Sequence, residues 1–426
     1  MKGNRERKSN HWLTKIGLIL GTLTLLLVVS CSTQSKQEST NKQPETLQGQ
    51  IILWGEIPIG LSEAQSSKNH EVLRDALENF SQLYPQVQVF VEFFPLGQIW
   101  ETFELNVERG AGPDLLLVDS SPKIPRLIQI GALRAIDDSQ VDQSQFRPEA
   151  LKAVRYHGKF YGLPLNLSTQ VLCYNPDKVK ELPRTLPELI EQAKQGYSVG
   201  LLSGFAETFW GTGVFGGRLL DDRGRIILVQ EGGWAKWMAW LKEAQNEPNF
   251  ILSDDAEALQ QAFVEGKLAY LTCWSSWIPY FSEALGKDKL GATLLPGGAD
   301  QPATPLLWSR LALFSRASSP NQSRIALKLA QFFTNVEQQK QIETENPVIP
   351  SDQKTTLNRG LFPLQAVLLE QSRTAVAVSL DDAEKFEVID DYGDILYQQV
   401  LAGEIAPDEA ATKFTQTVNR QFRRKE

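Results

Sequence analysis

Residues 159–179, which read KFYGLPLNLSTQVLCYNPDKV, contain the stretch that decides the fold. A hairpin-like turn at His157-Gly158 precedes it, and Pro164 leads into a long extended run from Leu165 to Tyr174. This run interrupts a regular alternation of strand and helix patterns on both sides. We therefore expect a single strand that crosses from one lobe of the protein to another.

The length and composition agree with two lobes. A single hydrophobic core stops growing near roughly 250–300 residues, and this chain has 426. Its 42% hydrophobic and 22% charged residues are typical of a soluble globular protein. The net charge of −8 disfavours a nucleic-acid partner, because binding to phosphates needs a basic surface.

The segments that precede the crossing run predict an α/β fold. Apolar strands at Gln50–Glu56, Val87–Phe94 and Asp114–Asp119 are separated by helical patterns, the first of which ends before Pro85. Strands spaced in this way indicate βαβ units with a parallel sheet. Strand and helix patterns alternate again after the crossing run, as far as an amphipathic helix that begins at Pro407.

The first thirty residues are typical of a signal peptide. Residues 16–29 are almost wholly apolar but short for a membrane span, which needs about 20 residues, and basic residues precede them: Lys2, Arg5, Arg7, Lys8 and Lys15. The stretch ends in Val28-Val29-Ser30-Cys31, which resembles the lipobox of bacterial lipoproteins. The resemblance implies that residues 1–30 are removed and that Cys31 becomes an acylated N-terminus. The alternative is an uncleaved anchor helix with an incidental cysteine.

Residues 31–47 are predicted to form a disordered tether. Between Ser32 and Glu45 there is no aliphatic residue, and Ser, Gln, Thr and Lys dominate. Such a segment cannot bury enough apolar area to fold. We therefore expect a lipid-anchored protein outside the cytoplasmic membrane, on its periplasmic side or at the cell surface.

Two further cysteines, Cys173 and Cys273, would lie in an oxidising compartment, where pairing is possible. A disulfide needs their Cα atoms within about 7 Å, which the sequence does not show. Buried free thiols are common. We favour two unpaired, inert core cysteines and leave the disulfide as the alternative.

The sequence offers little for catalysis or metal binding. His70 and His157 have no partner at metal-ligand spacing, and His11 lies in the signal peptide. Residues 211–216 spell GxGxxG but do not lie directly between a strand and its helix. Helix caps, turns or surface positions explain the acidic pairs: Asp221-Asp222, Asp254-Asp255, Asp381-Asp382 and Asp390-Asp391. We predict no catalytic residue, no cofactor and no metal.

Tryptophan is the notable residue of this chain, which has ten. Trp54, Trp274, Trp277 and Trp308 each follow a predicted strand. Ligands bind outside the carboxyl ends of strands in open α/β sheets, and a flat aromatic face beside polar groups suits a sugar ring. The alternative is that these side chains fill the core.

Residues 268–281, LAYLTCWSSWIPYF, are expected to contain both core residues and ligand-facing residues. We expect a buried strand as far as Cys273, in which the cysteine has no chemical role. Ser275, Ser276 and Trp277 are then expected to face a ligand, whereas Trp274 points the other way.

Four segments in order resemble the extracellular solute-binding proteins of ABC importers, in the maltose-binding-like, sugar-type family: GPDLLLVDSSPKIPRLIQIGALRAID (112–137), FYGLPLNLSTQVLCYNPD (160–177), AFVEGKLAYLTCWSSW (262–277) and LAGEIAPDEAATKFTQTVNRQF (401–422). The resemblance implies an α/β, two-lobed periplasmic-binding-protein-like fold with a hinge between lobes. Lobe 1 would comprise residues 48–166 and 303–348, and lobe 2 residues 167–302 and 349–426. It also implies a monomer without enzyme activity that closes on a sugar or oligosaccharide and delivers it to permease subunits with a cytoplasmic ATPase.

The resemblance also implies a ligand site. Carried over segment by segment, it comprises Trp54, Glu56, Asp119, Ser120, Ser121, Asn166, Ser168, Phe205, Glu207, Ser276, Trp277 and Trp308. The sequence departs from the maltodextrin-binding pattern twice: Val118 stands where a stacking tryptophan would be, and Ser168 stands where an acid would be. We therefore expect another sugar or a sugar-like polyol rather than maltose.

Other functions remain as alternatives. The chain could be a secreted glycoside-acting enzyme, since glycosidases use two carboxylates, or a carbohydrate-binding lipoprotein with no role in transport. Binding of polyamine or iron is disfavoured. A polyamine would require more acids clustered beside the aromatic residues, and iron requires Tyr or His ligands.

Overall fold

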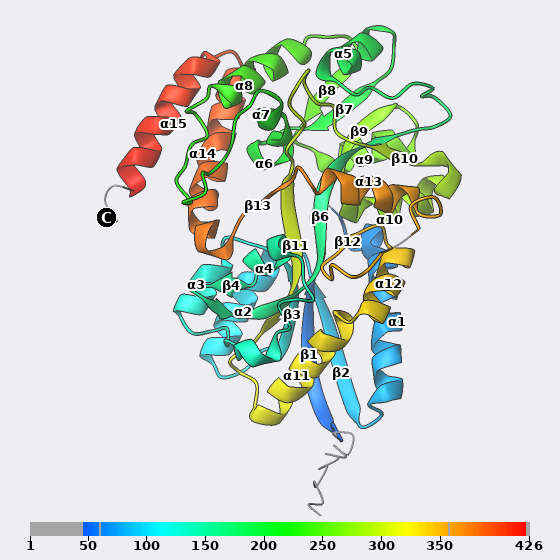
Figure 1. Ribbon diagram of the computed structural model, residues 1–426, viewed down its shortest axis with the longest axis vertical. Helices are drawn as coiled ribbons and strands as arrows, with labels where there is room; N and C mark the ends of the chain where they lie inside the picture. The colour runs from blue at the N-terminus through cyan, green and yellow to red at the C-terminus, as the bar shows by residue number, and fades with distance from the viewer. Residues whose placement is uncertain (1–45, 59–60, 357, 423–426) are drawn as a thin grey trace, which may run out of the picture. The chain divides into compact units, whose positions relative to one another are not determined.

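The computed structural model describes residues 46–58, 61–356 and 358–422 (Figure 1). The predicted signal peptide, the Cys31 lipidation site and the tether as far as residue 45 lie outside the described residues. None of the helices in the described part of the chain combines the length and the apolar character that crossing a bilayer requires.

A mixed sheet runs through the molecule in the order β2-β1-β3-β11-β6-β9-β7-β8, with β10 and β12 paired to β6 and β13 paired to β11. β1 lies parallel to both β2 and β3, as the βαβ pattern predicted. β4 and β5 form a separate hairpin around His157 and Gly158. The strands are β1 Gly49–Glu56, β2 Val87–Phe94, β3 Leu115–Asp119, β4 Arg155–Tyr156, β5 Lys159–Phe160, β6 Gly162–Tyr174, β7 Val199–Leu202, β8 Phe250–Ser253, β9 Tyr270–Trp274, β10 Gly291–Thr293, β11 Leu306–Phe314, β12 Ile349–Pro350 and β13 Val376–Ala377.

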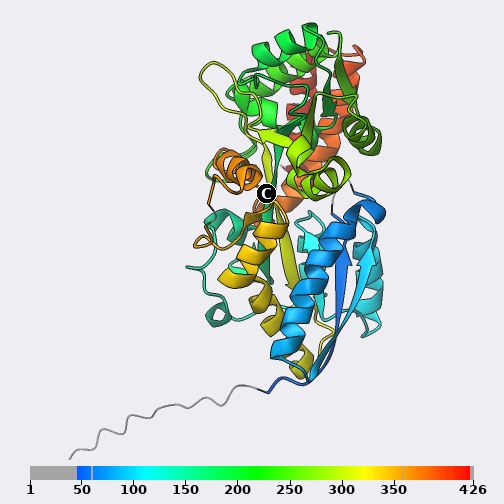
Figure 2. The same cartoon turned by 90° about the vertical axis from the view of Figure 1, so that its right-hand side faces the viewer.

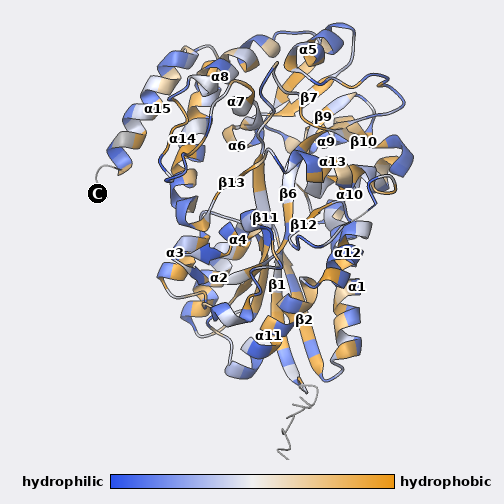
Figure 3. Ribbon diagram, in the orientation of Figure 1, coloured by the Kyte–Doolittle hydropathy of each residue, from blue (hydrophilic) through white to orange (hydrophobic). Residues whose placement is uncertain are grey.

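Helices flank the sheet on both sides (Figure 1, Figure 2). Apolar residues gather on the strands, whereas polar residues are frequent on the outer turns of the helices (Figure 3). Asp255 caps α9, as its sequence context predicted. The helices are α1 Ser67–Leu83, α2 Gln98–Glu108, α3 Ile124–Gln129, α4 Pro148–Lys152, α5 Leu186–Lys194, α6 Phe205–Thr208, α7 Trp210–Val214, α8 Gly233–Ala244, α9 Ala256–Val264, α10 Ile278–Leu285, α11 Pro320–Phe333, α12 Val336–Glu345, α13 Pro363–Gln371, α14 Ala383–Leu401 and α15 Pro407–Phe422.

β6 is the predicted crossing strand. Its first part, residues 162–169, pairs antiparallel with β11, and its second part, residues 170–174, pairs antiparallel with β9. Leu163 belongs to the hydrophobic core built on β1 and β3, whereas Val171 belongs to the core built on β7 and β9. The two-lobed α/β fold is therefore confirmed, and β6 joins its two cores.

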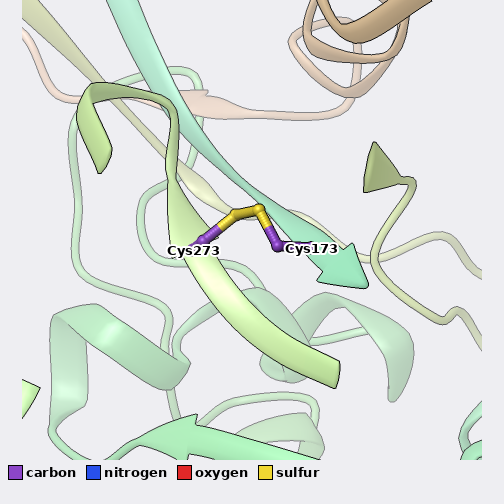
Figure 4. Close-up of a disulfide and its surroundings, with 2 residues drawn as sticks. All are labelled: Cys173 and Cys273. Atoms are coloured by element: carbon purple, nitrogen blue, oxygen red, sulfur yellow. A yellow bond between two sulfur atoms is a disulfide. The ribbon is translucent and has the colours of Figure 1, made fainter. Parts of the chain in front are cut away.

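The two internal cysteines form a disulfide, contrary to the favoured prediction (Figure 4). Cys173 in β6 and Cys273 in β9 lie on adjacent strands, with their Cα atoms 5.9 Å apart. Both residues are fully buried. Sequence reasoning failed here because the antiparallel register of β6 and β9, which brings together residues 100 positions apart, is a tertiary property.

Candidate functional site

A cavity of about 400 Å³ lies beside β6 and β11. The carboxyl ends of β1 and β3 contribute to its lining, as do α6, the turn after β9, and α14. Such strand ends are where open α/β sheets bind ligands. Most of the predicted ligand residues line this cavity: Glu56, Asp119, Ser120, Ser121, Asn166, Ser168, Glu207, Ser276 and Trp308.

Three predicted aromatic residues do not line the cavity and belong instead to the hydrophobic cores: Trp54, Phe205 and Trp277. Trp54 lies within β1 rather than after it, and its ring packs on Phe94 with centroids 4.7 Å apart. Phe205 is fully buried at the start of α6 and meets Trp234 edge-on at 6.0 Å. Position near a strand end therefore did not suffice to expose these rings.

The turn after β9 explains the wrong prediction for Trp277. β9 ends at Trp274, and the next three residues form a 3-10 helix, so the alternation of a strand does not continue. Trp277 turns inward, is 1% exposed, and meets Phe281 edge-on with ring centroids 6.3 Å apart. Trp274, which we expected to point away, lines the cavity together with the two serines that follow it.

Glu56, Asp119 and Arg310 form one charged wall of the cavity, here called the lobe-1 wall. Arg310 Nη1 lies 3.3 Å from Asp119 Oδ1, and its other terminal nitrogen donates to the backbone carbonyl of Glu56. The Glu56 carboxylate accepts from the backbone N–H groups of Gly97 at 2.9 Å and Asp119 at 3.4 Å. Burial, aided by the Asp119 charge, raises the pKa of Glu56 to about 7. Within this wall, Glu56 therefore titrates near neutral pH.

Hydrogen bonds hold the hydroxyl groups of the cavity in place. Ser120 Oγ accepts from the backbone N–H of Ser309 at 3.1 Å, which ties the end of β3 to β11. The hydroxyls of Ser168 and Ser275 lie 2.7 Å apart and connect β6 with the turn after β9. These contacts fix polar groups from separate elements around one space.

Glu207 and Asp390 line the cavity from α6 and α14 and form a second charged wall, the lobe-2 wall. Burial raises the pKa of Asp390 to about 8, and the charge of Glu207 adds to this effect. Burial also raises the pKa of Glu207 to about 7. The surface or cap interpretation of Asp390 is therefore wrong: it lies four residues after Phe386 on α14, and both side chains line the cavity.

Aromatic rings complete the lining: Phe93, Trp100, Trp274, Trp308, Phe333 and Phe386. Trp308 meets Phe386 edge-on with centroids 5.5 Å apart. His70 stacks on Phe93 at 3.8 Å, and burial lowers the pKa of His70. A neutral imidazole has one donor and one acceptor nitrogen, so this side chain can bind a hydroxyl group.

Several polar atoms of the lining are buried and have no hydrogen-bond partner among the described residues. They are Asn69 Nδ2, His70 Nε2, Ser276 Oγ, Trp308 Nε1, Asn346 Oδ1 and Asp390 Oδ1. Buried polar atoms are almost always paired, with protein, water or ligand, because desolvation without a partner is costly. The set contains both donors and acceptors, which is what a polyhydroxyl ligand can satisfy.

Sequence reasoning missed His70, Arg310, Asn346 and Asp390 as cavity residues. One signal was available, because Phe386 and Asp390 stand four residues apart and so share a helix face. The other three lie on α1, on β11 and just after α12, and the proximity of these segments depends on the tertiary fold.

Comparisons with known proteins agree with this fold. A family model described as bacterial extracellular solute-binding protein matches residues 75–355. The galactooligosaccharide-binding protein of Bacillus subtilis (strain 168) is 21% identical over 407 residues, with 91% of this chain and 93% of the relative covered. The maltodextrin-binding protein MdxE of the same organism is 26% identical over 254 residues, with 50% and 59% covered.

Solved structures show the same architecture. The GacH receptor of Streptomyces glaucescens, studied without ligand and with acarbose, has a TM-score of 0.74 at 21% identity, covering 88% of this chain and 98% of the receptor. The maltose/maltodextrin-binding domain MalE of Bdellovibrio bacteriovorus, bound to maltotriose, has a TM-score of 0.72 at 21% identity, covering 88% and 100%.

Proposed function

We propose that this chain, which belongs to the bacterial extracellular solute-binding protein family, captures a sugar or sugar-like polyol outside the cytoplasmic membrane and delivers it to an ABC permease. The observation that carries the proposal is the cavity itself. Aromatic rings line it beside buried donors and acceptors that have no partner among the described residues. The apolar faces of a sugar ring can stack on these aromatic rings, and its hydroxyl groups can pair with the buried donors and acceptors.

The mode of capture is also part of the proposal. β6 and β11 supply Asn166, Ser168, Trp308 and Arg310 to the cavity, and the same strands connect the two cores. Closure about these strands would enclose the ligand between the lobes. Cys31 would carry the lipid anchor, and the monomer would deliver its ligand to permease subunits powered by a cytoplasmic ATPase.

The enzyme alternative has less support. The curated relatives are named as binding proteins. Glu56 accepts two backbone hydrogen bonds and lies near the Arg310 ion pair, so it is held as a structural group of the wall. Across the described residues no group of three or more His, Cys, Asp and Glu side chains is arranged to hold a metal.

Calorimetric titration with a sugar panel, followed by analysis of the recovered ligand, tests the proposal. We expect binding at about micromolar strength and an unchanged ligand. Trp308→Ala should weaken binding by about tenfold, because an aromatic contact contributes about 0.5–1.5 kcal/mol beyond the apolar area it buries and about 1.4 kcal/mol corresponds to tenfold in affinity. A hydrolysed product would refute the receptor function, and unchanged affinity in the variant would remove Trp308 from the site.

A further inference from the structure

The two charged walls of the cavity differ in charge balance, because only the lobe-1 wall contains a cationic side chain. On the lobe-1 wall, Arg310 offsets the charges of Asp119 and Glu56. On the lobe-2 wall, the charged groups that act on Asp390 are all acids: Glu207, Asp394 and Asp391. Acidic groups without a cationic partner among the described residues are therefore concentrated where α6 and α14 meet the cavity.

Protein groups satisfy this acidic wall only in part. Asp394 Oδ1 accepts from the backbone N–H of Phe205 at 2.5 Å, and the N–H of Ala206 is directed to Asp390. Asp390 Oδ1 nevertheless remains buried and without a partner among the described residues. Neutral amides supply hydrogen bonds but no opposite charge, and buried carboxylates require compensation by a cation or by protonation.

A second observation, independent of the acids, also points to a ligand with several donors. Asn346 is only 6% exposed, and its Oδ1 atom has no partner although the residue lines the same cavity. Its amide nitrogen is already used, since it donates to Asn69 Oδ1 at 3.2 Å. The cavity therefore presents unpaired acceptors both on α14 and at the end of α12.

Aromatic groups share the cavity with the acidic wall. Phe386 lies one helical turn before Asp390, Trp308 meets Phe386 edge-on at 5.5 Å, and Trp274 belongs to the same lining. Cations bind favourably beside aromatic faces, the more so when water is excluded. A cationic ligand requires acids close to aromatic rings. The sequence did not reveal such an arrangement, but this cavity contains both kinds of group.

We propose that the captured carbohydrate carries a protonated amine, as in an amino sugar or an aminocyclitol-containing oligosaccharide, and that Asp390 and Glu207 bind this amine at the lobe-2 wall. The inference rests on the proposed function, the capture of a carbohydrate, and it narrows the class of carbohydrate to those that carry an amine. An ammonium group offers donors to the unpaired Asp390 oxygen and the charge that the protein does not supply there. The raised pKa values of both acids agree with a wall that lacks its cation.

The test compares matched ligand pairs by calorimetry with the full-length protein at pH 7. One pair is the β-1,4-linked glucosamine trimer and cellotriose, which differ by amine against hydroxyl; the other is acarbose and maltotetraose. We expect the amine-bearing member of at least one pair to bind about tenfold or more tightly than its neutral counterpart, because charge-assisted hydrogen bonds are the stronger ones.

Variants of the lobe-2 wall test whether its acids cause the preference for the amine-bearing ligand. Asp390→Asn should reduce the preference for the amine by about tenfold, whereas Glu404→Gln, at an exposed position beyond the end of α14 and outside the cavity lining, should leave it unchanged. Neutral sugars that bind as tightly as amines would overturn the inference and leave the proposed function standing. A preference that survives Asp390→Asn and Glu207→Gln together would also overturn it. If no carbohydrate binds, the proposed function fails as well.

Discussion

The Cys173–Cys273 disulfide should be a major source of stability. It joins β6 to β9 across a sequence separation of 100 residues. In the chain-entropy model, closing a loop of about 100 residues in the unfolded chain stabilises the native state by about 4.7 kcal/mol. Native proteins are stable by only about 5–15 kcal/mol. We therefore expect reduction, or the double variant Cys173→Ala/Cys273→Ala, to lower the free energy of unfolding by about 3–5 kcal/mol.

Urea unfolding followed by tryptophan fluorescence measures this loss. Wild-type protein is unfolded with and without a thiol reductant, and the double variant serves as the control on which the reductant should have no effect. With a slope of about 3 kcal/mol per molar urea or more for a chain of this size, the midpoint should fall by about 1 M.

The reasoning fails if the reductant leaves the wild-type midpoint unchanged. It also fails if thiol titration of the urea-unfolded, unreduced wild type finds the side chains of Cys173 and Cys273 free. Either result would restore the prediction of two unpaired core cysteines.

Two further predictions concern stability near the cavity. Trp277→Ala should lower the free energy of unfolding by about 3–5 kcal/mol, as for other fully buried aromatic side chains, and a thermal melt no different from wild type would contradict its core position. Burial raises the pKa of Glu56 from 4.5 to about 7, so its contribution to stability is fully present below about pH 4.5 and is lost as pH rises through about 7. The loss is about 3 kcal/mol. Urea midpoints at pH 5 and pH 8 should show this decline in wild type and a flatter profile in Glu56→Gln.

Local sequence signals predicted the fold because each one has a local physical cause. The extended run from Leu165 to Tyr174 lies within β6, which begins three residues earlier, and most of its side chains are buried. It pairs with β11 in its first part and with β9 in its second. The Asp255 cap and the His157-Gly158 hairpin turn likewise depend on a few neighbouring residues. Positions at the carboxyl ends of β1 and β3 then led to Glu56, Ser120 and Ser121, which line the cavity.

The remaining errors arise where local periodicity was extended too far or where distant segments meet. Pro279 near the start of α10 was a signal that a helix begins there, and it would have ended the strand alternation before Trp277. Arg310 pairs with Asp119 from a strand nearly two hundred residues away, so no local pattern could assign it to the cavity. The acidic wall depends in the same way on the approach of α14 to α6.

The two departures from the maltodextrin-binding pattern now have a structural reason. Val118 is fully buried in its core, so a stacking ring at this position would displace core side chains, and Trp308 supplies an aromatic surface from β11 instead. The Ser168 hydroxyl is paired with Ser275 and carries no charge, whereas Asp390 brings an acid to the cavity from α14. Aromatic and acidic groups of the cavity thus come from β11 and α14. For this reason the sugar panel should extend beyond α-1,4-linked glucose oligomers.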